Sequence, residues 1–169
     1  MTLRKSTVED VSDVLEILYE TSRWLDSRGI FQWPFDWMKS QENAFIREIE
    51  RGQFYIYEEF KSILGVLHLT SALNPLWEGR DEDAFYVSKI AVKCKDTNQQ
   101  IGSWMLEQVE EIARVEGRLR IRLDCVSNNP KLKDYYEKRG FQFIEQKTLP
   151  KVTLDLYEKR LTSFESQGH

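Results

Sequence analysis

The chain has 169 residues, of which 41% are hydrophobic and 31% are charged, and its formal net charge is −4. This length suits a domain that buries about two thirds of its unfolded surface, so we expect a single domain over residues 1–169. The negative charge argues against a broad nucleic-acid-binding surface, and no apolar run approaches the ~20 residues that a membrane span requires. The N-terminus lacks the apolar core of a signal peptide, and we therefore expect a cytoplasmic protein.

Cysteine and histidine are scarce in this chain. The cysteines are Cys94 and Cys125, and the histidines are His68 and His169. We expect both cysteines to be reduced packing residues, as is usual in an intracellular chain. Two histidines do not easily assemble a multi-histidine metal site or a histidine-based catalytic triad, so we predict no metal cofactor.

The first half of the chain alternates between strand and helix patterns. A capping pattern precedes apolar residues at helical spacing, and glycines end both predicted helices. Aromatic and branched residues then predict two strands joined by a tight polar turn. Strands are expected at 2–5, 54–60 and 63–70, and helices from 7 to 29 and from 44 to 52.

The second half continues the same alternation. A proline, a glycine and several charged residues predict a loop over the surface, and strands and helices follow it in turn. The loop is expected at 74–83, strands at 84–93, 122–125, 141–146 and 152–157, and helices from 101 to 117 and from 130 to 140. Strands that alternate with helices in this way favour a mixed α/β domain.

A strand, a polar break and a short helix follow one another in residues 122–141. Asn129 and Pro130 end the strand, and a proline suits the first turn of a helix. Leu132 and Tyr136 are four residues apart and share one helix face, so Tyr136 is expected to point inward. An amide and a phenol at such a joint can hold a ligand and pass it a proton.

Three segments, in this order, carry a family resemblance. The first is Trp24-Leu25 with Gly29-Ile30 and Gln32-Trp33; the second is Val87-Ser88-Lys89-Ile90-Ala91-Val92 with the helix from Ile101; the third is Arg122-Leu123-Asp124-Cys125 with Asn129, Leu132, Tyr135-Tyr136-Glu137 and Gly140-Phe141. Together they resemble the GCN5-related N-acetyltransferase (GNAT) superfamily, from Leu3 to about Arg160. The resemblance implies a mixed, mostly antiparallel central sheet of six to seven strands flanked by about four helices.

The resemblance also implies acetyl transfer from acetyl-CoA to an amine, directly in a ternary complex. The strand backbone at Ile90, Ala91 and Val92 is expected to splay from its neighbour and bind the pantetheine arm, and a bulge would achieve this. The N–H near Val92 would then stabilise charge on the thioester oxygen. Burial in the sheet explains the same side chains equally well, and both roles are compatible because the proposed one belongs to the backbone.

The start of the following helix is expected to hold the CoA pyrophosphate, because unpaired N–H groups and the helix dipole favour an anion there. The implied cofactor-binding residues are Gln99, Gln100, Ile101, Gly102 and Ser103. Family members usually show R/Q-x-x-G-x-G/A, whereas this chain has Thr97 in place of the leading residue and Gln100 in place of the middle glycine. A plain helix cap is the other interpretation of this loop.

By the resemblance, Asn129 binds the pantetheine or acetyl region, and Tyr136 binds the cofactor and protonates the departing thiolate. A phenol with a pKa near ~10 is protonated at neutral pH and suits that role. An asparagine beside a proline is often only a cap, and either Tyr136 or Tyr135 can be a core residue instead.

The attacking amine also needs a base, and no spacing singles one out. The candidates are Glu78, Glu82, Asp83 and Asp124. We interpret the first three as solvated surface charges. His68 lies in an apolar strand and reads as a core histidine rather than a base. The aromatic residues of 24–37 form either an apolar wall on the acceptor side or packing between helices.

We therefore expect an acetyl-CoA-dependent N-acetyltransferase whose acceptor is a small-molecule or peptide amine. Nucleic acid and membrane are not expected as partners, and a homodimer is compatible with the sequence. The alternative, which Thr97 and Gln100 motivate, is a module of this fold that only binds CoA or another protein.

Overall fold

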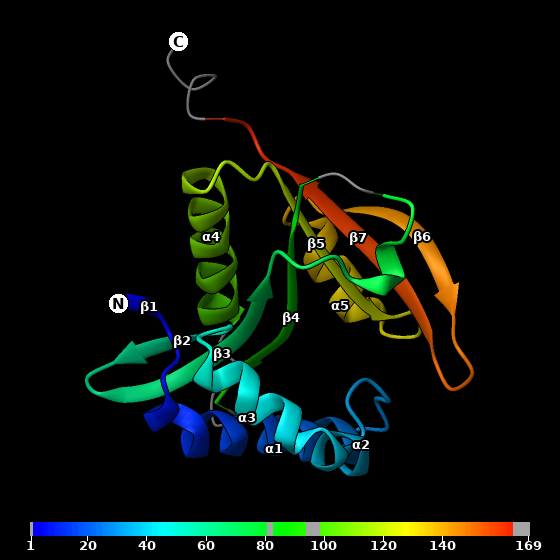
Figure 1. Ribbon diagram of the computed structural model, residues 1–169. Helices are drawn as coiled ribbons and strands as arrows, with labels where there is room; N and C mark the ends of the chain where they lie inside the picture. Colours follow the sequence, from blue (N-terminus) through cyan, green and yellow to red (C-terminus); the bar gives the residue numbers. More distant parts are fainter. Residues whose placement is uncertain (1, 81–82, 94–98, 164–169) are drawn as a thin grey trace. The chain divides into compact units, whose positions relative to one another are not determined.

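The computed structural model describes residues 2–80, 83–93 and 99–163 (Figure 1). The helices are α1 (Val11–Ser27), α2 (Phe35–Ser40), α3 (Glu42–Glu50), α4 (Gln99–Val115) and α5 (Pro130–Glu137), with short 3-10 turns η1 (Val8–Asp10) and η2 (Pro75–Trp77). The strands are β1 (Thr2–Lys5), β2 (Phe54–Glu59), β3 (Ser62–Thr70), β4 (Phe85–Val92), β5 (Arg120–Val126), β6 (Gln142–Thr148) and β7 (Thr153–Arg160). These elements confirm the expected mixed α/β fold.

Hydrogen-bonded neighbours place the strands in the order β1-β2-β3-β4-β5-β7-β6. The chain divides into two compact units. The first unit contains residues 1–69 and 88–108, and the second contains residues 70–87 and 109–169. The expectation of a single domain stays a prediction.

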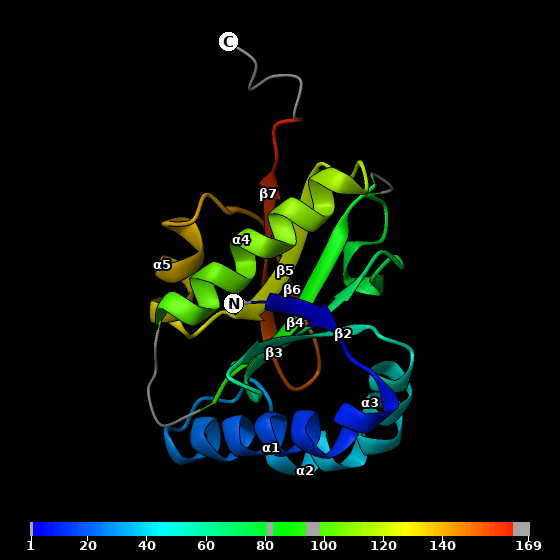
Figure 2. The same ribbon diagram turned by 90° about the vertical axis from the view of Figure 1, so that its left-hand side faces the viewer.

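In the first unit, β1, β2 and β3 pair antiparallel in sequence order. Figures 1 and 2 both show α1, α2 and α3 on one side of these strands and the start of α4 on the other. Alternate residues of each strand therefore pack against helices on opposite sides of the sheet. Ile56 belongs to the core formed with α1 and α3, whereas the ring of Tyr57 lies 5.1 Å from that of Trp104 in α4.

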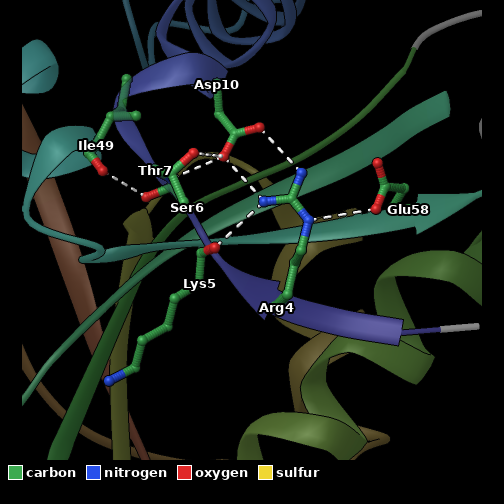
Figure 3. A network of polar contacts seen from close by, with 7 residues as sticks. All are labelled: Arg4, Lys5, Ser6, Thr7, Asp10, Ile49 and Glu58. Atoms are coloured by element: carbon green, nitrogen blue, oxygen red, sulfur yellow. Dashed lines mark hydrogen bonds and ion pairs between the residues drawn. The ribbon is translucent and has the colours of Figure 1, made fainter. Parts of the chain in front are cut away.

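A polar network fastens β1 to η1 and β2 in the first unit (Figure 3). Arg4 donates from both terminal nitrogens to Asp10, at 2.9 and 3.0 Å, and from Nε to Glu58 at 3.3 Å. The Thr7 N–H also donates to Asp10, at 2.7 Å, as the capping pattern predicted. These donors lower the pKa of the buried Asp10 carboxyl, with Arg4 as the largest cause.

In the second unit, β5, β7 and β6 pair antiparallel. The two faces of β7 serve different partners. Leu156 packs with Trp77 and Tyr86 on one face, and Tyr157 lies against Tyr136 of α5 on the other, with ring centroids 6.4 Å apart. Trp77 is fully buried, so the expectation of a simple surface loop at 74–83 was wrong at this residue.

The structure contains one helix, α2, that the sequence pattern did not predict. α2 has only six residues and lies in an aromatic stretch just after Pro34, where the proline and the short length hide a helical pattern. It packs beside α1, where the ring of Phe35 lies 5.8 Å from that of Tyr19. The other predicted elements agree with the observed bounds to within a few residues.

Candidate functional site

The strand β4 contains an irregularity at Lys89, the residue before Ile90-Ala91-Val92. Lys89 has a φ of +52°, in the left-handed region that residues with side chains rarely adopt. Such a residue interrupts the pleat of a strand, as in a bulge, and redirects the backbone that follows it. Lys89 lies one residue before the segment assigned to the pantetheine arm, and the expected splay of that segment stays a prediction.

The residues of β4 that pair with β5 lie at the beginning of β4. The ladder is parallel and pairs Phe85 with Ile121 and Tyr86 with Arg122. Both pairs lie within the second unit. The segment Ile90–Val92 belongs to the first unit, where Ala91 is buried and its two neighbours are half-buried.

The helix α4 begins at Gln99 in the first unit. Gln100 is exposed, Ile101 and Ser103 are half-buried, and Gly102 is buried. Behind this turn, an added Cβ on Gly65 would lie 2.9 Å from the Met105 sulfur and 3.6 Å from Ile101, so a larger residue at this position would displace the Met105 side chain. Thr97 and the rest of 94–98 lie outside the described residues.

Asn129 is the cap of α5, as one of the two interpretations predicted. Its side-chain oxygen accepts a hydrogen bond from the Leu132 N–H at 3.3 Å. The turn before it is held by the buried Asp155, which accepts from Ser127 at 2.6 Å and pairs with Lys133 at 2.8 Å. The backbone at this joint is thus fixed from both sides.

Tyr136 points inward, as its spacing predicted, and is only 6% exposed. Its ring contacts Tyr135, Phe141 and Tyr157 with centroid separations between 5.6 and 6.4 Å. Burial is the main cause that raises its pKa above the ordinary phenol value. Tyr135 is half-buried, and the guanidinium of Arg139 lies 3.4 Å from its ring centroid.

The carboxylates named as candidate bases are dispersed. Asp83 has a side chain that is 89% exposed and pairs with Arg118 at 3.4 Å, and Glu78 is also exposed. Glu82 lies outside the described residues. Asp124 is half-buried in β5, and the carboxylate that Arg122 contacts at 2.8 Å is that of Glu158.

Sequence reasoning missed a pair of titratable side chains in the first unit. His68 on β3 is 9% exposed, and its Nε2 lies 3.8 Å from Oε2 of Glu48 on α3. The other ring nitrogen, Nδ1, lies 3.4 Å from the hydroxyl of Ser88 on β4. Glu48 resembles an ordinary surface charge of an amphipathic helix, and only its contact with His68 distinguishes it.

The remaining chemistry of the described residues is limited. Burial raises the pKa of Cys125 to about 12, so its thiol is a poor nucleophile at neutral pH. Cys94 lies outside the described residues. Across 2–80, 83–93 and 99–163, no group of three or more histidine, cysteine, aspartate or glutamate side chains is arranged to hold a metal ion. No helix in these same ranges is long and apolar enough to cross a membrane.

Comparison with known proteins agrees with the fold. The sequence profile described as "Acetyltransferase (GNAT) family" matches residues 16–141, and the chain therefore belongs to this family. An uncharacterized N-acetyltransferase of Bacillus subtilis, YesJ, is 27% identical over 161 residues, which cover 92% of this chain and 87% of that protein.

Two solved structures share the fold. A GNAT-family acetyltransferase from Listeria monocytogenes has a TM-score of 0.79 and 23% identity, with 95% of this chain and 94% of that chain covered. The PaiA N-acetyltransferase from Thermoplasma acidophilum, solved in complex with coenzyme A, has a TM-score of 0.73 and 22% identity, with 94% and 98% covered.

Proposed function

We propose that this protein transfers the acetyl group of acetyl-CoA to an amine of a small molecule or peptide, directly within a ternary complex. The observation that carries the proposal is the left-handed backbone at Lys89, immediately before Ile90–Val92 in β4. The family membership and the coenzyme A bound to the Thermoplasma relative support the choice of cofactor.

The first unit supplies two features that fit this cofactor. After the irregularity at Lys89, backbone N–H groups of Ile90–Val92 can bind the amide-rich pantetheine arm, and the N–H near Val92 can face the thioester oxygen. The helix α4 begins at Gln99, and the dipole at its N-terminus attracts an anion such as pyrophosphate.

The second unit supplies the proposed acid. Acetyl-CoA, when bound, provides a thioester whose leaving group is a thiolate that needs a proton. Tyr136 carries a proton throughout the neutral range, because its raised pKa keeps the phenol uncharged. Asn129 is held by its cap and by the turn before it, and we assign it to the pantetheine or acetyl region.

Direct transfer follows from the absence of an activated thiol among the described residues. Cys125 is buried, and its pKa is raised further by the negative charges of Asp155 and Asp124. A protonated, buried thiol does not compete with an amine for a thioester. We accordingly propose no acetyl-enzyme. As a separate expectation from the sequence, we propose that the reaction takes place in the cytoplasm.

Gln100 in the first turn of α4 favours a second candidate, a protein of this fold that binds a partner without catalysis. A glutamine keeps its backbone farther from phosphate than a glycine does. Calorimetric titration with acetyl-CoA separates the two functions. Micromolar binding followed by acetylation in a panel of primary amines supports the enzyme, whereas no heat at millimolar acetyl-CoA rejects it.

A further inference from the structure

The pair Glu48–His68 contains two buried polar atoms that no hydrogen bond satisfies. Glu48 Oε2 and His68 Nε2 both lack a partner within hydrogen-bonding distance, although they face each other at 3.8 Å. Leaving such atoms unpaired in the interior of a protein is destabilising. Buried polar atoms of this kind are normally satisfied, so the pair has the character of a site that takes a ligand or a proton.

The surroundings of the pair change its acid–base behaviour. Burial and the nearby cation of Lys89 lower the pKa of His68 to about 4, so the imidazole is neutral at physiological pH. Burial raises the pKa of Glu48 above its usual range, while Lys89 and Arg47 act in the opposite direction. Glu48 is thus a carboxylate made more basic by its environment, which is what a general base near neutral pH requires.

Geometry favours one arrangement of protons on His68. A carboxylate oxygen opposite Nε2 stabilises the tautomer that carries its proton on that nitrogen. Nδ1 then accepts from the hydroxyl of Ser88. The imidazole also lies edge-on to Phe54, 5.2 Å from its ring centroid, so packing holds the ring in place.

The pair is connected to the proposed cofactor strand within the first unit. Ser88, which contacts His68, is followed directly by Lys89, with its left-handed backbone, and then by Ile90–Val92. A primary ammonium needs room for contacts of about 2.8–3.0 Å. The Glu48 side chain is 31% exposed, so an ammonium can reach its carboxylate from solvent while the Nε2–H of His68 faces Oε2.

We propose that Glu48 and His68 form the acceptor-amine site, in which Glu48 is the general base and His68 positions it. This inference rests on the proposed function. The Glu48 carboxylate takes one proton from the acceptor ammonium, and the neutral amine attacks the thioester carbonyl carbon. A C–N bond forms, the C–S bond breaks, and the thiolate takes a proton from Tyr136. The attacking nitrogen gives its second proton to the resulting Tyr136 phenolate, and Glu48 gives its proton to water, so one proton is released overall.

The test uses the full chain, acetyl-CoA, and the primary amine that the panel identifies as the best acceptor. The pH dependence of kcat/KM is measured for the wild type, for Glu48→Gln, and for Glu50→Gln, an exposed glutamate on the same helix. At pH 7 we expect Glu48→Gln to lose roughly 100-fold or more in kcat/KM, the usual contribution of a general base. Glu50→Gln should match the wild type.

The shape of the pH profile separates a base from a structural residue. Without a base, only amine that is already neutral reacts, so the rate of Glu48→Gln should rise about tenfold per pH unit toward an ammonium pKa of ~10. The deficit relative to wild type should therefore shrink as pH rises. His68→Gln should reduce kcat/KM roughly tenfold through the lost contact with Glu48. Thermal unfolding and the acetyl-CoA dissociation constant are measured for each variant as controls of folding.

Each outcome bears on one of the two proposals. A deficit in Glu48→Gln that is the same at every pH, or no deficit at all, overturns the acceptor site while acetyl-CoA binding and wild-type turnover leave the proposed function intact. A wild-type protein that binds no acetyl-CoA and acetylates no amine overturns the proposed function, and the acceptor site with it.

Discussion

Arg122 donates from Nε to Glu158 Oε2 at 2.8 Å, and the two residues are only 1% and 7% exposed. The same guanidinium donates to the Arg80 carbonyl at 2.9 Å and to the Tyr86 hydroxyl at 3.0 Å. It also lies 4.7 Å from the centroid of the Trp77 ring. One buried cation thereby holds the β3–β4 connection against β5 and β7 within the second unit.

We predict that Arg122→Met destabilises the protein by about 3–5 kcal/mol, because it leaves the buried Glu158 carboxylate without its closest partner. Arg160→Met is the matched control, since Arg160 pairs with the same carboxylate at 3.4 Å but has an exposed side chain. It should cost no more than about 1 kcal/mol. Urea denaturation measures both, and equal losses would contradict the assignment. Adding Glu158→Gln to Arg122→Met should recover part of the loss.

Asp10 should make the free energy of unfolding depend on pH in the acidic range. Its pKa is lowered in the folded state, so the stabilisation is fully present above the unfolded value of ~3.9 and is lost as pH falls toward the folded value. Asp10→Asn should lower the free energy of unfolding by about 2 kcal/mol at pH 7 and by progressively less below pH 4. Asp13→Asn, an exposed neighbour, serves as the control. A constant difference between pH 7 and pH 2 would refute this assignment.

Tyr136→Phe should reduce kcat by roughly 100-fold, the lower end of the range for a general acid, and leave the acetyl-CoA dissociation constant within about twofold. The ring and its contacts are retained, so only the proton is lost. Single-turnover kinetics and calorimetry provide the two measurements. Tyr135→Phe is the matched control, and it should turn over at the wild-type rate. Equal rates for Tyr136→Phe and the wild type would remove Tyr136 from the mechanism.

Gln100→Glu should separate helix stability from cofactor binding. A negative charge in the first turn of α4 favours the helix dipole, so the melting temperature should stay the same or rise. The same charge repels pyrophosphate, and acetyl-CoA should bind about tenfold more weakly. Gln108→Glu, farther along α4, should leave affinity unchanged. Unchanged affinity in Gln100→Glu would place the phosphates elsewhere.

Local sequence patterns were sufficient to predict most of the helices and strands. The alternation at Ile121 to Leu123 and the helical spacing of Leu132 and Tyr136 depend on neighbours a few residues away, so β5, α5 and the inward direction of Tyr136 could be predicted. The cap at Asn129 is also local. The short helix α2 was missed because six residues are too few for a period to emerge.

The candidate acceptor site could not be predicted in the same way. Glu48, His68 and Ser88 are separated by about 20 residues each and come from a helix and two strands. The fold brings His68 within 3.8 Å of one partner and 3.4 Å of the other. Taken separately, they read as a surface charge, a core histidine and a strand residue, because burial and facing partners are properties of the packed chain.

The sequence by itself determined the order and type of most elements other than α2, the family resemblance, and the positions of Ile90–Val92, Asn129 and Tyr136 along them, because these follow from local periodicity and motif. Only the tertiary structure decided that Lys89 takes a left-handed conformation, that Trp77 is buried, and that Glu48 faces His68. The burial of Trp77 and the pairing of Glu48 with His68 depend on contacts between segments distant in sequence, which local periodicity does not encode.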